Sequence, residues 1–136
     1  METNTSTEHI ENAGSTVKAF GMFFLGWLVP GLGHIAQKRY LKGVVFFTGI
    51  LLLSVFGVIM QGKYYDTSQL HPLMLLGFVG DVGSGLFYLI IKALGFGKGN
   101  IEAITYNYGI AYLVCAGLLN YLVALNAFDI AKGRRK

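Results

Sequence analysis

The sequence has few charged residues, a single cysteine and only two prolines. Asp, Glu, Lys and Arg make up 13% of the 136 residues, whereas soluble domains carry about 25%. Cys115 stands alone, so it cannot form a disulfide within the chain, and we interpret it as a small packing residue in an apolar segment. The composition therefore argues against an ordinary soluble domain.

The sequence also lacks the spacings that mark catalytic and metal sites. No Ser-His-Asp or Cys-His arrangement stands at a recognisable spacing, and no second His or Cys stands three or four residues from His34 or His71. The turn Gly31-Leu32-Gly33 lacks the preceding strand and the Gly-Lys-Ser/Thr ending of a phosphate loop. We therefore expect a protein that is not an enzyme and binds no metal or cofactor.

What the chain has instead is 54% apolar residues and 19 glycines, a combination typical of helices that approach closely in lipid. Four apolar segments, at 19–32, 43–60, 73–91 and 106–128, predict an all-α integral membrane bundle with about four transmembrane segments. The first is short, because a helix of its length spans about 21 Å and a hydrocarbon core is about 30 Å thick. We expect a mobile polar tail at 1–17, a membrane domain at 18–128 and a basic tail at 129–136.

Basic residues outnumber acidic ones by 11 to 7, giving a net charge of +4. They gather beside the apolar segments, where Lys and Arg anchor helices to lipid headgroups, so we expect a lipid bilayer as partner and no nucleic acid. The predicted headgroup contacts are Lys38, Arg39, Lys42, Arg134 and Arg135.

The path of the third segment decides which basic residues share a side of the membrane. If it crosses, Lys63 lies on the opposite side from Lys92 and Lys98, and the positive-inside rule gives no orientation. If it is re-entrant, the two basic clusters of the chain fall on one side. We expect a crossing, because its mostly apolar length matches a span, with the re-entrant path as the alternative.

Asp81 lies in the middle of the third segment, where a carboxylate is normally paired, protonated or facing a cavity. Helical spacing places it on one face with Gly77, Ser84 and Gly85, so we expect an interhelical packing contact there. A proton or ion relay through Asp81 is the alternative, although such a relay usually needs a second charged group at the same depth.

Asn120 is the polar residue at the centre of a small-residue stripe in the fourth segment, next to Gly117. We expect it to hydrogen-bond either Asp81 or a backbone carbonyl, and so to hold helices together.

The turn after the first segment contains Pro30, Gly31, Gly33 and His34, and we expect it to lie at the membrane interface. His34 and His71 both stand near segment ends, where an interfacial histidine makes a turn hydrogen bond. The alternative is that either ring ligates a metal or a tetrapyrrole.

Two stretches resemble known families. Trp27-Leu-Val-Pro-Gly-Leu-Gly-His34, followed by Lys38-Arg39 and Gly43-Val-Val-Phe-Phe47, resembles the hairpin of the TM-two domain. The stretch 106–133, with Ala-Gly-Leu-Leu-Asn and Asp-Ile-Ala-Lys-Gly, is similar to the closing helix of a bacterial family of small polytopic membrane proteins of unknown function. The resemblance implies a multi-pass protein of a bacterial inner membrane and no particular reaction.

Three functions are compatible with these features. We expect a non-enzymatic membrane protein that serves as an accessory subunit or assembly partner of a larger membrane complex, with other membrane protein subunits as partners. One alternative is an accessory subunit of an electron-transfer or photosynthetic complex that contacts a tetrapyrrole through His34 or His71. The other is a small transporter or ion-conducting oligomer that uses Asp81, against which no inverted repeat is evident.

Overall fold

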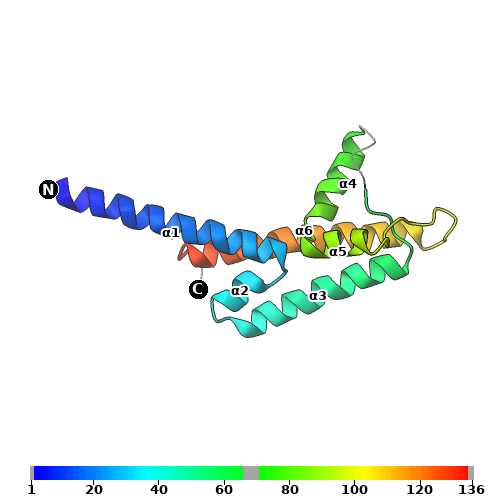
Figure 1. Ribbon diagram of the computed structural model, residues 1–136, viewed down its shortest axis with the longest axis horizontal. Coiled ribbons are helices and arrows are strands. Elements are labelled where there is room, and N and C mark those ends of the chain that lie inside the picture. The colour runs from blue at the N-terminus through cyan, green and yellow to red at the C-terminus, as the bar shows by residue number, and fades with distance from the viewer. Residues whose placement is uncertain (1, 66–70, 135–136) are drawn as a thin grey trace.

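The computed structural model describes residues 2–65 and 71–134, and helices dominate them (Figure 1). In this part of the chain there is no strand beyond one isolated β-bridge, between Lys63 and Lys98. The prediction of an all-α protein is therefore confirmed. The helices are α1 (Glu2–Leu28), α2 (Leu32–Ala36), α3 (Tyr40–Ile59), α4 (Pro72–Val82), α5 (Leu86–Ala93) and α6 (Tyr106–Ala131).

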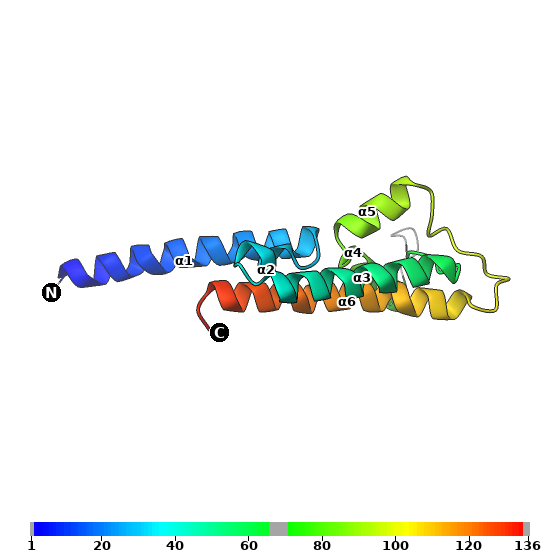
Figure 2. The same ribbon diagram turned by 90° about the horizontal axis from the view of Figure 1, so that it is seen from below.

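Helix α6 is the axis of the bundle, and α1, α3 and α4 all pack against it. Helices α3 and α6 run side by side in opposite directions (Figures 1 and 2). Ile50 of α3 meets Ala116 and Val123 of α6 in a buried cluster. Further along, Gly57 faces Leu113 so closely that a Cβ would overlap the leucine side chain. Small residues on this seam let the two helices approach, as is usual for helices that pack in lipid.

Two helices, α3 and α6, are long and apolar enough to cross a membrane. The pair α4 and α5 qualifies as a third only if it counts as one span, because it is bent by 102°. The structure thus supports two or three candidate spans among its described residues, and the expected four are not shown. In α1 the apolar part is too short, since it follows Lys18 and ends at Leu28 before the turn at Pro30 and Gly31.

Helix α1 contains polar residues of the N-terminal segment as well as the apolar residues that follow them. The predicted boundary at residue 17 does not coincide with a helix end, because α1 runs from Glu2 to Leu28. Within it, the Thr16 hydroxyl donates to the Asn12 carbonyl at 2.8 Å, four residues back along the same helix. No proline interrupts this run, so the polar residues continue directly into the apolar turns.

The third apolar segment is not one helix. It breaks between Val82 and Leu86, where Gly85 has φ +59° and ψ −120°. That backbone conformation is open to glycine and strained for other residues. Gly85, which we expect on a packing face with Gly77, is therefore also the point at which the helix breaks.

The bent pair returns to the end of the bundle from which it starts. Lys63 follows α3 and Lys98 precedes α6, and the two are joined by the β-bridge. A crossing would separate these two residues by the thickness of a membrane. Their pairing therefore favours the re-entrant path over the expected crossing.

Candidate functional site at the junction of two helix breaks

Two helix breaks meet midway along the bundle. Helix α1 ends at Leu28 and α2 turns back from it, while α5 begins close to the same point (Figures 1 and 2). The contact is tight, because a Cβ on Gly85 would collide with the carbonyl oxygen of Trp27. The last carbonyls of a helix have no partner within that helix, so such a junction exposes backbone acceptors that need donors.

Asn120 of α6 supplies those donors. Its side chain is fully buried, and its amide nitrogen donates to the carbonyl of Trp27 at 2.8 Å and to that of Gly83 at 2.7 Å. The two hydrogens of one amide thus satisfy one acceptor on each side of the junction. Of the two partners that the sequence left open, Asn120 binds backbone carbonyls and not Asp81.

Glycines let the α4–α5 break lie directly on α6. A Cβ on Gly117 would overlap the Gly80 carbonyl, and one on Gly83 would stand 2.5 Å from the Gly117 carbonyl oxygen. Helix α4 therefore approaches the backbone of α6 as well as its side chains, which also brings the Gly83 carbonyl within reach of Asn120.

Asp81 is fully buried and turns toward the loop that follows α3. Its Oδ2 accepts a hydrogen bond of 2.8 Å from the backbone N–H of Tyr65, and its backbone carbonyl accepts one of 2.7 Å from the Ser84 hydroxyl. Gly77, one turn earlier, faces the Tyr65 ring. Asp81 and Gly77 therefore both contact Tyr65 of this loop.

Two buried side-chain oxygens near the junction, Asp81 Oδ1 and Asn120 Oδ1, have no hydrogen-bond partner among the described residues.

Next to Asp81, the Tyr64 ring packs edge-to-face on the Tyr88 ring, with centroids 5.0 Å apart. The pKa of the Tyr64 hydroxyl is raised, mainly because the hydroxyl is buried. No pattern in the sequence indicates this pairing, since the two tyrosines belong to separate elements.

The turn around His34 is buried within the protein. His34 has no exposed surface, packs on Phe46 at 5.2 Å between centroids, and has no hydrogen-bond partner at either ring nitrogen within the described residues. Burial is the main reason why the pKa of the His34 ring is lowered, and the nearby positive charges of Lys42 and Arg39 lower it further.

The glycines of this turn explain its burial. Gly31 has φ +80°, and a Cβ there would overlap the Gly43 backbone. Gly33 lies against the Met22 carbonyl and Ala127. Pro30 is buried with them.

Four of the five predicted headgroup residues are described, and they lie at one end of the bundle, where α3 begins and α6 ends. Lys38, Lys42 and Arg134 are exposed, and Arg39 is half-buried. Arg134 stands 4.0 Å from Asp129 in an exposed ion pair. Arg135 lies outside the described residues. His71, by contrast, is exposed at the start of α4.

No group of three or more His, Cys, Asp or Glu side chains is placed to hold a metal ion in the part of the chain that the structure describes. A family model described as a family of unknown function (DUF6677) matches residues 21–136. No curated protein and no solved structure matches the chain.

Proposed function

We propose that this chain, which belongs to the DUF6677 family of unknown function, is a multi-pass membrane protein that acts by associating with other membrane proteins. In this role it serves as an accessory subunit or assembly partner and carries out no reaction of its own. A bacterial inner membrane is the location that goes with the resemblance of its turn and closing helix.

The distribution of apolar side chains is the observation that carries the membrane part of the proposal. Only 22% of the most apolar stretch of α3 and 39% of that of α6 are buried inside the protein. Leu41 is 81% exposed, Ile59 67% and Leu122 64%. Exposed apolar surfaces of this extent are characteristic of contact with lipid or with another protein.

The association part is supported by how the buried polar groups are used. Asn120 and Ser84 bond backbone carbonyls at the junction, and the Tyr121 hydroxyl donates to the Val79 carbonyl at 3.0 Å. The bonds of Asn120 and Tyr121 join separate helices, and the bond of Ser84 lies within the break between α4 and α5. Among the described residues these groups form no converging set of nucleophile, base and oxyanion donor.

Helix α4 offers a surface for a partner. It stands away from the axis of α6 in Figure 1, and its side chains Leu75, Leu76 and Val79 are 51%, 67% and 45% exposed. A hollow of about 480 Å³ lies between α4 and α6, lined in part by Leu76, Gly77 and Val114. Small and apolar residues in such a hollow suit close packing by a helix of another subunit.

Ion or proton movement through Asp81 is the second candidate. The specific observation in its favour is a buried carboxylate oxygen without a partner, beside a broken helix, because broken helices often frame ion sites in transporters.

The proposal is tested by purifying the tagged full chain in mild detergent and measuring, by quantitative mass spectrometry, the membrane proteins retained with it. Leu76→Gln on α4 is compared with Leu122→Gln, an equally exposed leucine on α6. We expect one or more membrane proteins in stable ratio with the wild type and the control, and reduced recovery with Leu76→Gln. A chain that always purifies without any such partner contradicts the association proposal.

A further inference from the structure

Helix α1 has two faces that differ in their surroundings. One face packs on α6, where Ala19 is fully buried and Gly26 lies against Ala124. On the same side, the Phe20 ring packs edge-to-face on Phe128, with centroids 5.4 Å apart. The other face points away from the protein, and the N-terminal turns of the helix extend beyond the end of α6 (Figures 1 and 2).

The outward face carries apolar and small residues at the spacing of a helix that pairs with another helix. They recur at alternating intervals of four and three residues, which is the pattern of a coiled-coil seam. Of its larger side chains, Ile10 is 73% exposed, Val17 71% and Phe24 61%. A Cβ on Gly14 or Gly21 would have nothing within 4 Å. This outer stripe consists of Ile10, Gly14, Val17, Gly21, Phe24 and Leu28.

Large and small residues alternate along the outer stripe, so the stripe fits a copy of itself. In a parallel pair of helices, a side chain of the seam enters a hole formed by four residues of the facing helix. Val17 of one copy would enter the hole between Gly14 and Gly21 of the other. Glycines at the rim of this hole let the two backbones approach closely, as small residues do where helices pack in membranes.

The membrane sets the direction of a second copy. Helix α6 is long and apolar enough to cross it, and α1 packs on α6. Copies that are inserted in the same orientation therefore hold α1 at the same depth and in the same direction. Each offers the other an identical stripe, in parallel and at matching height.

The charges beside the outer stripe are compatible with this pairing. Glu11 and Lys18 are exposed and border the stripe along one edge, whereas Ala13 lies along the other. In a parallel pair, each edge faces the opposite edge of the partner helix. Lys18 would then stand across from Ala13, and the two charges of one copy would not face the like charges of the other.

We propose that the outer stripe of α1 binds a second copy of this chain as a parallel pair of helices. The inference goes beyond the proposed function, because the partner surface named there lies on α4 and does not involve α1. A different membrane protein and lipid alone are the other possible occupants, and the experiment separates them.

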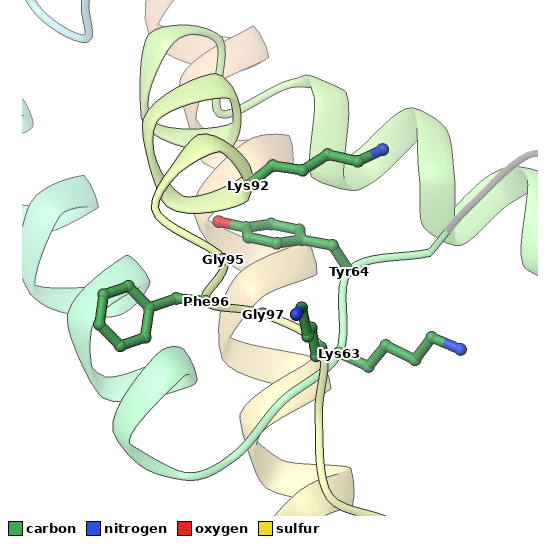
Figure 3. Close-up of a pocket in the computed structure, with 7 residues that line it drawn as sticks. Lys63, Tyr64, Lys92, Gly95, Phe96 and Gly97 are labelled. Atoms are coloured by element: carbon green, nitrogen blue, oxygen red, sulfur yellow. The ribbon is translucent and has the colours of Figure 1, made fainter.

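The test measures Förster resonance energy transfer between donor- and acceptor-labelled full chains in phosphatidylcholine vesicles. The dyes are attached at Lys63→Cys in a Cys115→Ser background, an exposed position beside a cavity at the end of the bundle remote from the outer stripe (Figure 3). Val17→Glu and Val17→Lys each place a charge in the middle of the stripe. Asn12→Glu is the control, because it places the same charge on an exposed position on the side of α1 away from the stripe.

We expect energy transfer in the wild type and in Asn12→Glu. Val17→Glu alone and Val17→Lys alone should each associate about tenfold more weakly, which corresponds to about 1.4 kcal/mol, since like charges then face each other. Mixing Val17→Glu with Val17→Lys copies should restore transfer, because opposite charges meet only if two copies share this seam. Leu76→Gln on α4 should leave transfer unchanged, so a failure of the α4 proposal is a separate result.

A wild type without energy transfer, or a mixture that does not recover it, overturns the proposal. A membrane protein that is lost from Val17→Glu while the wild type shows no transfer assigns the stripe to that protein instead. If the charged variants do not insert, Val17→Cys and Asn12→Cys are compared by oxidative cross-linking in the Cys115→Ser background. A disulfide between copies should then form at position 17 and not at 12, and equal cross-linking at both positions overturns the proposal.

Discussion

Asn120 on α6 donates a hydrogen bond of 2.7 Å to the carbonyl of Gly83, 37 residues earlier in the chain. Gly83 caps the C-terminal end of α4, where backbone carbonyls have no hydrogen-bond donor within the helix. Without Asn120 this carbonyl would be buried without a donor. Because the same amide also serves Trp27 at the end of α1, one side chain joins three elements. The junction of the two helix breaks depends on it.

Replacing Asn120 with Leu should therefore destabilise the bundle. The variant leaves two buried carbonyls without donors, and hydrogen bonds between helices in membranes are worth about 0.6 to 2 kcal/mol each. We expect a clear fall in thermal unfolding midpoint in detergent. Leu122→Ala, at a neighbouring exposed position, should change the midpoint little. Equal midpoints for the two variants would show that the junction does not need Asn120.

Gly117→Ala should separate α4 from α6. The added Cβ overlaps the Gly80 carbonyl, and backbone cannot move aside cheaply; overpacking of this kind costs about 1 to 3 kcal/mol. Gly49→Ala on α3 is the matched control, because nothing lies within 4 Å of its Cβ. Accumulation in the membrane and thermal stability are the measurements, and a Gly117→Ala protein as stable as the control contradicts the close contact.

Asp81 should be replaceable by Asn but not by Leu as far as folding is concerned. The Asn side-chain oxygen can still accept from the Tyr65 N–H, whereas Leu leaves that buried donor unpaired, at a cost of about 1 to 3 kcal/mol. Hydrogen exchange of the Tyr65 amide should be slow in Asp81→Asn and faster in Asp81→Leu. Unchanged exchange in both variants would mean that the carboxylate does not hold this loop.

Lys63 and Lys98 should be reached from the same side of the membrane. In a Cys115→Ser background, a membrane-impermeant maleimide should label Lys63→Cys and Lys98→Cys from one side and Lys38→Cys from the other. This follows from the bridge between the two lysines and from the antiparallel course of α3 and α6. Labelling of positions 63 and 98 from opposite sides would contradict the re-entrant path and show that the third segment crosses the membrane.

The sequence was most informative where one local signal decides the structure. Apolar length predicted helices at 43–60 and 106–128, close to the observed α3 and α6, and Pro30 with Gly31 marked the end of the first. The break at Gly85 was missed, because a glycine needed for a left-handed conformation reads the same in sequence as one needed for close packing.

The contacts of the site depended on topology and were harder to predict. The partners of Asn120 lie 37 and 93 residues away, and backbone carbonyls carry no signal in the sequence. Lys63 and Lys98 meet because α4 and α5 form a bent pair between them. The burial of His34 was also not predictable, since polarity alone does not reveal that glycines on both sides of it allow close packing.

The most direct test of the central claim, action by association, compares a strain lacking the protein with one carrying Asp81→Asn. The account predicts that the deletion weakens a larger membrane assembly, measured by native electrophoresis of mildly solubilised membranes. Asp81→Asn should keep both the assembly and the normal phenotype. An Asp81→Asn protein that accumulates normally, leaves the assembly intact and still reproduces the deletion phenotype would contradict the account and assign the function to chemistry at Asp81.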